Sequence, residues 1–560
     1  MTKKVGQTSE IPVKNSVEEP FANVPEQVTE KPDTGLAQQT ANQPVEEQAE
    51  KSKEQAVDQT VEKSVSEPVE QYPEKPVEKR KGKELQLALD LVEPGDDDEN
   101  SYGKQERVSK HLPPEVTSRM LYKDVVRIAW PSLMELTLTQ LASMVDLMMV
   151  GGLGPWAITS VGLTIQPKFL MMIAFMAMNV GATALVARHK GEGKPEKANM
   201  ALRQALLLTF VLSIISSVVG FFLSESMVRF MGAADAQTLA GGTVYLKIQM
   251  AGFIVLALTS TFTATLRGVG NTRIAMLYNL MANIINVIFN YLLIHGHFGF
   301  PRMELAGASL ATVIGQCAAF VVALIVLLRG KHYLKLELNK GFKPQWESIG
   351  RIFKIGFPAM VEQTVMRTGI IIFSKTVASL GTVDFAIHQI CMNIQALTFM
   401  TGNAFGISGT SLVGQSLGKK RPDMAQAYSS RTRRLGMCVS LVLALIFFFF
   451  GKQIVSLYSD EPQIIFQGAK ILMLVAFIQP FQSSQFILAG VLRGAGDTRS
   501  VAIITFITVL LVRPGLAILG IHALNWGLIG AWIAVIADQL LRSLLVLLRF
   551  NSGKWKSVKV

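Results

Sequence analysis

Most of the chain alternates between long apolar stretches and short polar segments. From residue 121 onward, apolar runs of about 20 residues recur, and each is long enough to cross a hydrocarbon core of ~30 Å as a helix. The pattern predicts twelve membrane-spanning helices, over residues 124–150, 157–184, 203–223, 244–266, 273–294, 305–328, 352–378, 385–412, 435–456, 470–491, 500–521 and 527–548. The expected fold class is therefore an all-α integral membrane protein.

Basic residues in the connecting segments indicate how the predicted spans are oriented. If the N-terminus is cytoplasmic, the segments after the second and eighth spans are cytoplasmic too, and they carry Arg188, Lys190, Lys194, Lys197, Lys419, Lys420, Arg421, Arg431, Arg433 and Arg434. The external segments carry Arg229, Arg302, Lys452 and Lys470. Cytoplasmic loops are typically the more basic ones. We expect a multi-pass protein of the plasma or inner membrane with both termini in the cytoplasm.

Composition separates this region from the first 120 residues. Hydrophobic residues make up 49% of the chain and the mean hydropathy is +0.34, which is typical of a membrane protein. Residues 1–120 hold 16 of the 54 basic and 25 of the 42 acidic residues, so the remainder holds 38 and 17. Because the first segment repeats Pro, Glu, Gln, Val and Lys, we expect a disordered, charged cytoplasmic tail. The basic surplus of the remainder lies at span ends, so we expect no nucleic-acid binding.

The two halves of the predicted membrane region repeat one another. Leu266–Arg273 and Leu492–Arg499 share six of eight residues at an offset of 226. Two further pairs recur 227 residues apart: Pro131 with Pro358, and Glu135 with Glu362. Each repeat holds six spans, so both enter from the same side and should be related by a two-fold axis along the membrane normal. We expect pseudo-symmetric six-helix lobes at 121–335 and 345–550, a short basic cytoplasmic tail at 551–560, and alternating access by rocking of the lobes.

These segments also carry a family resemblance. Pro131 leads to Met144-Val-Asp-Leu-Met-Met-Val-Gly151, and the paired Leu-Arg-Gly-x-Gly-x-Thr-Arg segments and Ala386-Ile-His-Gln389 follow. Over residues 121–550 the chain resembles the multidrug and toxic-compound extrusion (MATE) family. The resemblance implies a cation-coupled antiporter, driven by Na+ or H+, that exports organic cations and related amphiphiles.

The first predicted span carries an acid at membrane depth, which is costly and therefore usually functional. Glu135, Thr139 and Asp146 share one helical face, which we expect to look into a cleft. Pro131 is the expected hinge of the first lobe, and Pro358 that of the second. Asp146 is the expected cation-binding carboxylate, and in the resembled family the acid at this position binds the coupling ion. For Glu135, substrate contact and a structural role both stay open.

The fifth span adds a stripe of amides, Asn283, Asn286 and Asn290. Amide oxygens suit a cation as well as a hydrogen bond. We expect Asn286, Asn290 and Thr312 of the sixth span to complete the cation site, and Asn283 to line the cleft. Ordinary hydrogen bonding between helices is the alternative. Part of the family has Asp where Asn290 stands, so this site holds one negative charge. The amides favour Na+ slightly, whereas H+ needs a single carboxylate.

The second half lacks this chemistry. Asp146 aligns with Phe373, and where one branch of the family has acids on the seventh and tenth spans, this chain has Met366 and Ser483. Glu362 lies one turn before Met366 and is a candidate substitute that contacts substrate, with Arg367 as its neutralising partner. A structural role is equally open for Glu362. His388 is a further candidate for lining the cleft.

Other classes of protein are disfavoured. The segment Gly191-Glu-Gly-Lys-Pro195 lacks the spacing of a Walker phosphate-binding loop, so ATP is not expected to drive transport. No catalytic set of His, Asp, Glu or Ser converges in the sequence, and no metal-ligand spacing is present beyond the possible Na+ site. We therefore expect a monomer in the lipid bilayer that is not an enzyme, has no cofactor and takes small organic cations. The alternative is a flippase of lipid-linked saccharides, whose cleft should be more cationic.

Overall fold

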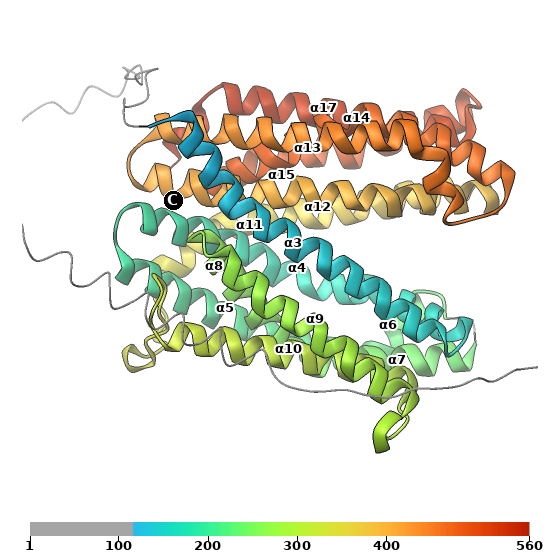
Figure 1. The fold of residues 1–560 in the computed structure, drawn as a ribbon, viewed down its shortest axis with the longest axis horizontal. Coiled ribbons are helices and arrows are strands. Elements are labelled where there is room, and N and C mark those ends of the chain that lie inside the picture. Colours follow the sequence, from blue (N-terminus) through green and yellow to red (C-terminus); the bar gives the residue numbers. More distant parts are fainter. Residues whose placement is uncertain (1–115, 234, 559) are drawn as a thin grey trace, which may run out of the picture. The chain divides into compact units, whose positions relative to one another are not determined.

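The computed structural model describes residues 116–233, 235–558 and 560, so the predicted tail lies outside it except for its last five residues. Secondary structure in this part of the chain is helical (Figure 1). The first repeat contains α3 (Ser118–Gly151), α4 (Pro155–Gly191), α5 (Pro195–Phe222), α6 (Ser224–Phe230), α7 (Ala236–Ala251), α8 (Phe253–Gly268), α9 (Thr272–His295) and α10 (Glu304–Leu328). The second contains α11 (Trp346–Ala378), α12 (Thr382–Gly418), α13 (Pro422–Ser456), α14 (Pro462–Ala495), α15 (Thr498–Thr505), α16 (Arg513–Ile518) and α17 (Gly527–Asn551).

Each predicted span corresponds to one helix or one helical run. Among the described helices, nine are long and apolar enough to cross a membrane singly, and α7 with α8, bent by 53° at Gly252, makes a tenth. The run from α15 to α16 counts as one of the nine, and π-helical turns at Phe506–Val512 and Leu519–Ala523 widen it. α11 and α12 have 33 and 37 residues but fall outside the ten, because polar side chains interrupt their apolar runs. The all-helical membrane fold is confirmed.

Proline determines where several helices begin. Pro155, Pro195, Pro422 and Pro462 are the first residues of α4, α5, α13 and α14, where the missing N–H costs nothing and the fixed φ suits the first turn. Two of these starts, Pro195 and Pro422, occupy equivalent positions in the two repeats. Proline inside a helix has a different effect, because it leaves one carbonyl without its usual partner.

The helices pack as two bundles (Figure 1). In the first, α9 packs on α3 and α10, and α4 packs on α5, α7 and α8. In the second, α14 packs on α12, α13 and α17, and α11 packs on α15. Across the boundary, α3 contacts α12, and α4 contacts both α11 and α12. The residue limits predicted for the two lobes stay predictions.

The two lobes meet closely at one end, at which α3 begins and α4 and α8 end; we call this the proximal end. Hydrogen bonds cross the boundary there from Ser408 Oγ to Val125 O at 3.2 Å, Ser411 Oγ to Gly268 O at 2.9 Å, Gln415 Nε2 to Gly268 O at 3.1 Å and Tyr428 Oη to Asp124 Oδ2 at 2.8 Å. Side-chain donors that bind backbone carbonyls of the other lobe fix the distance between the two backbones. The proximal end is therefore closed.

Two equivalent glycines make this closure possible. Gly191 ends α4 and Gly418 ends α12, and they occupy the same position in the two repeats. A Cβ added to Gly191 would fall on the carbonyl oxygen of Gln415 and lie 2.9 Å from the Cα of Gly418. A Cβ on Gly418 would likewise fall on the carbonyl oxygen of Arg188. The lobes can approach this closely because neither position carries a side chain.

Replacing Gly191 with alanine is expected to loosen the proximal end. The new Cβ has to push two backbones apart, and such overpacking typically costs about 1–3 kcal/mol. We expect the thermal unfolding midpoint of the purified protein to fall. Gly162→Ala on the same helix is the matched control, because its Cβ would meet nothing within 4 Å. Equal midpoints for the two variants would contradict this explanation of the closure.

Candidate functional site

The polar face of α3 lies against α9 with the two helices running in parallel. Asn279 Nδ2 donates to Glu135 Oε1, Asn283 Nδ2 donates to Thr139 Oγ1 at 3.2 Å, and Asn290 Nδ2 donates to Asp146 Oδ1 at 2.6 Å. All three pairs are separated by 144 residues. A constant separation means that the two helices stay in register over three turns, so Glu135, Thr139 and Asp146 on α3 each meet an amide on α9.

Asp146 has amide partners on both carboxylate oxygens. Asn290 is one partner, and Asn286 is the other. The Asn286 amide is oriented with its nitrogen toward the carboxylate, because this orientation gives both its nitrogen and its oxygen a hydrogen-bond partner. Asn286 Nδ2 then lies 2.8 Å from Asp146 Oδ1 and 3.0 Å from Asp146 Oδ2. The oxygen of Asn286 then accepts from Thr312 Oγ1 at 3.3 Å. Asn290 Oδ1 is buried and has no donor among the described residues. The structure thus brings together the four residues predicted for the cation site, around one unused acceptor.

A further set of polar residues extends this cluster through the first lobe. The Tyr245 hydroxyl is hydrogen-bonded to Thr312, and its backbone oxygen accepts from Ser309 Oγ at 2.8 Å. Ser309 in turn accepts from Gln249 Nε2 at 3.2 Å, and Gln249 Oε1 accepts from Lys168 Nζ at 2.7 Å. The ammonium of Lys168 and the carboxylate of Asp146 attract each other. An internal cation therefore already accompanies the one acid of the site.

Glu135 and Glu362 form equivalent ion pairs in the two lobes. Arg267 NH2 lies 2.8 Å from Glu135 Oε1, and Arg493 bonds to both oxygens of Glu362. The predicted pairing of Glu362 with Arg367 is wrong, because residues five apart on one helix point about 140° away from each other. The Cζ of Arg367 instead lies 3.7 Å from the centroid of the Phe169 ring on α4. With exposures of 5% and 1%, the two glutamates are buried behind their arginines.

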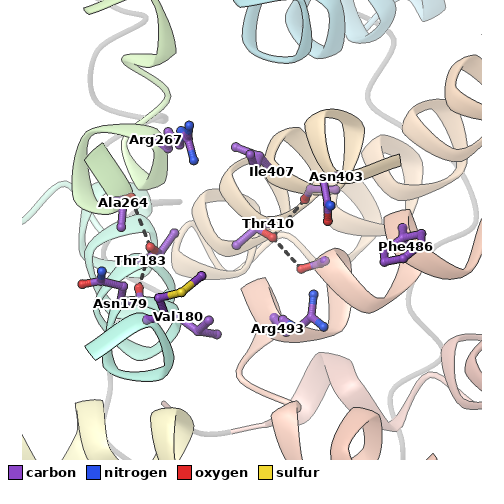
Figure 2. Close-up of a pocket in the computed structure, with 13 residues that line it drawn as sticks. Asn179, Val180, Thr183, Ala264, Arg267, Asn403, Ile407, Thr410, Phe486 and Arg493 are labelled. Atoms are coloured by element: carbon purple, nitrogen blue, oxygen red, sulfur yellow. Dashed lines mark hydrogen bonds between the residues drawn. The ribbon is translucent and has the colours of Figure 1, made fainter. Parts of the chain in front are cut away.

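A cavity of about 190 Å³ lies between the lobes (Figure 2). Of its thirteen lining residues, twelve form six pairs that occupy equivalent positions in the two repeats. Among these pairs are Thr183 with Thr410, Ala264 with Gly490 and Arg267 with Arg493. Because paired residues lie on both sides of the axis that relates the repeats, we call it the axial cavity. The two threonines even make the same bonds, from Thr183 Oγ1 to Ala264 O at 3.1 Å and from Thr410 Oγ1 to Gly490 O at 2.7 Å. Neither Glu135 nor Glu362 lines this cavity, so it does not support substrate contact by them.

The second lobe carries a buried cluster whose net charge is positive. Arg513 Nε and Arg542 NH2 lie 2.9 and 2.6 Å from Asp538 Oδ2, and Arg542 Nε donates to Thr508 at 3.1 Å. Asp538 and Arg542 are almost fully buried, at 0% and 1% exposure. Two guanidinium groups share one carboxylate, which leaves this cluster with a net charge of +1. Phe373, the counterpart of Asp146, lies nearby, with its ring centroid 5.7 Å from the Arg513 Cζ.

His388 does not line the cleft as predicted. It is 1% exposed, and its ring lies 5.5 Å from that of Phe373 and 5.6 Å from that of Trp532, so it packs inside the second lobe. Thr139 is exposed and Asn283 is half-buried, so both remain accessible beside α3. Pro131 and Pro358 lie inside α3 and α11, which continue as single helices through them. Their role as hinges stays a prediction.

Comparison with known proteins identifies the family. A sequence model described as MatE matches residues 131–292 and 358–519, one match in each repeat and together more than half of the chain. The chain belongs to the MatE family. This is a family of transporters, so the MatE protein described here is a multi-pass membrane protein, as the apolar helices also indicate.

Two relatives and one solved structure show how far the similarity extends. The "Probable multidrug resistance protein NorM" of Thermotoga maritima is 29% identical over 436 residues, which cover 78% of this MatE protein and 93% of the relative. The "Uncharacterized transporter YisQ" of Bacillus subtilis is 26% identical over 429 residues, covering 76% and 94%. A multidrug resistance MATE family transporter of the MOP superfamily, solved in an outward-facing conformation, superimposes with a TM-score of 0.72 at 20% identity, covering 78% and 97%. The two-lobed fold of this MatE protein is thereby confirmed.

Several residues of the site were missed from the sequence. Asn279 extends the amide stripe of α9 at the same helical spacing and could have been found from it. Arg267 and Arg493 recur in both repeats, as their glutamate partners do, and this joint recurrence was the available signal. Tyr245 and Gln249 lie on a bent helix pair and carry no sequence signal of their own.

Proposed function

We propose that this MatE protein is a proton-coupled antiporter that exports small organic cations across the cell membrane. The observation that carries the proposal is Asp146, whose carboxylate is held by two amides and adjoins an unused acceptor inside a membrane-spanning lobe. The name of the Thermotoga relative, a probable multidrug resistance protein, supports a drug-like cargo. The flippase alternative is disfavoured, because the Thermotoga relative is named as a probable multidrug resistance protein.

The amide of Asn290 gives the site two stable states. In the present state its nitrogen donates to the Asp146 carboxylate, and its oxygen has no donor among the described residues. A protonated carboxyl group is itself a donor and needs an acceptor. Rotation of the Asn290 amide by half a turn presents that acceptor. One side chain can thus satisfy both the charged and the protonated form of Asp146.

The same geometry favours H+ over the Na+ that the amide stripe suggested. A Na+ ion at Asp146 needs oxygen ligands, but both carboxylate oxygens already accept from amide nitrogens, which the ion would have to displace. A proton displaces one donor and gains an acceptor. The neighbouring ammonium of Lys168 also lowers the attraction of the site for a second hydrated cation.

In this mechanism the closed proximal end faces the cytoplasm, with both termini on that side, and cargo leaves toward the opposite face. Protonation of Asp146 removes the only negative charge of its cluster within the described chain. A cationic cargo is attracted to the charged form of Asp146, whereas the proton produces the neutral form. Proton binding and cargo binding therefore favour different conformations of the first lobe. The lobes then rock and open the proximal end. Coupling follows because the two ligands stabilise different states of one lobe.

The test uses proteoliposomes that contain a fluorescent organic cation. We expect a pH gradient in Na+-free buffer to drive its movement against a concentration gradient, and a Na+ gradient at equal pH on both sides to drive none. Liposomes with the Asp146→Asn protein serve as the control for leakage. Transport driven by Na+ alone, with no response to pH, would assign the coupling to Na+ and contradict the proton mechanism.

A further inference from the structure

An apolar groove on the surface of the second lobe lies between α11 and α15, which pack on each other (Figure 1). Its apolar wall is formed by Phe353, Phe357, Pro358, Val361, Ala502 and Ile503. Phe353, Phe357 and Ile503 are 48%, 45% and 60% exposed. Because this MatE protein spans a membrane, exposed apolar side chains on its helices face lipid. The groove is therefore accessible from the bilayer.

The shape of the groove follows from helical spacing on both sides. Phe353 and Phe357 are four residues apart on α11, so they share one face, and their rings stack with centroids 5.5 Å apart. On α15, Ala502 and Ile503 follow Arg499 by three and four residues, so Arg499 lies at one end of the same face. An extended apolar chain can lie along this groove while its polar end stays beside Arg499.

Lys354 on α11 and Arg499 on α15 edge the groove from its two sides, and we call them the basic pair. Both also line an adjoining pocket with a charged wall, so they stand where a polar pocket meets the apolar groove. The residues next to them are bonded to each other, because Thr498 Oγ1 donates to Ile355 O at 2.8 Å. This bond holds the two backbones together and places the long side chains of the basic pair beside one another.

The acids close to the basic pair are bound to other residues. Glu347 Oε1 lies 2.6 Å from Arg351 NH2, and Asp497 Oδ2 lies 2.7 Å from Arg549 Nε. Within the described chain, the exposed basic pair has no acidic partner. Positive charge without a partner beside an apolar groove is complementary to a ligand with an anionic group on an apolar chain. Anionic phospholipids have this chemistry, and basic sites between membrane-spanning helices typically bind them.

The first lobe carries the same residue types at equivalent positions. The basic pair corresponds to Arg127 and Arg273, at offsets of 227 and 226, and both arginines are exposed. Phe357 corresponds to Trp130, which is 58% exposed. Both repeats therefore have two basic residues and an exposed aromatic ring at one place, although other equivalent positions differ.

We propose that the groove between α11 and α15 binds one anionic phospholipid, with its phosphate between Lys354 and Arg499 and an acyl chain along the apolar wall. The phosphate oxygens accept charge-assisted hydrogen bonds from the ammonium and the guanidinium. The apolar stems of both side chains lie along the groove while their charged ends stay near water. The bound lipid contacts both helices and stabilises their packing. This site lies on the outer surface of the second lobe, so it does not depend on Asp146 or on proton coupling.

Binding is measured by native mass spectrometry of the purified, full-length protein in detergent. The probes are phosphatidylglycerol, phosphatidylcholine with the same acyl chains, and glycerophosphoglycerol, which is the anionic headgroup without chains. We expect phosphatidylglycerol to bind at a concentration at least about tenfold below that needed for phosphatidylcholine. An excess of glycerophosphoglycerol should not displace the lipid, because the apolar groove contributes to binding.

The variants remove or keep the charge of the basic pair. Lys354→Gln with Arg499→Gln should carry one phosphatidylglycerol fewer than the wild type at the concentration that saturates the wild type. Lys354→Arg with Arg499→Lys keeps both charges and should keep that lipid. The matched control is Lys419→Gln with Lys420→Gln, which removes the same charge from an exposed segment between α12 and α13 and should leave the number of bound lipids unchanged.

Three outcomes would overturn the proposal. The first is equal binding of the two lipids by the wild type. The second is an unchanged number of bound phosphatidylglycerol molecules in Lys354→Gln with Arg499→Gln, which would place the lipid elsewhere. The third is displacement by glycerophosphoglycerol, which would show a site for a soluble anion. Thermal unfolding shows that each variant is folded, and phosphatidylglycerol should raise the unfolding midpoint of the wild type more than that of the variant without the basic pair.

Discussion

Transport by the Asp146→Asn variant is expected to fall to the level of empty liposomes, while the protein stays folded and inserted. Asparagine has nearly the same size as aspartate and can still bond to Asn286 and Asn290, so the contacts of α3 with α9 survive. It cannot bind and release a proton. The measurement is uphill movement of a fluorescent organic cation in proteoliposomes under a pH gradient.

The control for this variant is Asp235→Asn. Asp235 is an exposed acid whose side chain caps α7 by accepting from the Thr238 N–H at 2.7 Å, and asparagine caps a helix equally well. It should transport at the wild-type rate. Wild-type transport by Asp146→Asn, with unchanged dependence on the pH gradient, would exclude Asp146 as the proton carrier and would refute the mechanism proposed above.

The largest loss of stability is expected from Asp538→Asn in the second lobe. The substitution leaves the guanidinium groups of Arg513 and Arg542 buried together without their shared carboxylate. Removing one partner of a buried ion pair typically costs about 3–5 kcal/mol. We expect this drop in the free energy of unfolding, measured by denaturant titration of the purified protein in detergent.

A double variant distinguishes lost charge pairing from lost packing. Asp538→Asn combined with Arg513→Gln restores the net charge of +1 that the native cluster has. The free energy of unfolding of this double variant should therefore fall by less than the sum of the losses measured for the two single variants. Strict additivity, or a cost below about 1 kcal/mol for Asp538→Asn alone, would show that the cluster contributes little to the stability of the lobe.

The features that the sequence predicted are those encoded locally or by repetition. The spans follow from runs of apolar residues, and the lobes follow from recurring segments such as Leu266–Arg273. The grouping of Asp146 with Asn286 and Asn290 was also accessible, because each polar stripe has helical spacing and a polar stripe in an apolar helix needs a partner. Nothing local, however, specifies which helix supplies that partner.

The predictions that the structure contradicts concern pairing in space. Glu362 was assigned to Arg367, its neighbour in sequence, whereas its partner Arg493 lies 131 residues away on α14. His388 was a candidate for lining the cleft, but the rings of Phe373 and Trp532 pack against it inside the second lobe. Lys168 joins the site through Gln249, which is 81 residues away. Such contacts depend on how helices pack, and helix packing is not readable from one sequence.

The contact between Gly191 and Gly418 also carries information about ancestry. In a homodimer with two-fold symmetry, a residue on the axis meets its own copy. Two repeats that descend from one duplicated gene inherit such a contact. In an ancestor made of two identical subunits, a side chain added at this position would have clashed with the same side chain of the other subunit. In such an ancestor a single mutation would change both glycines at once. Positions away from the axis had no such restriction after fusion, and Asp146 and Phe373 show how far two former copies could diverge.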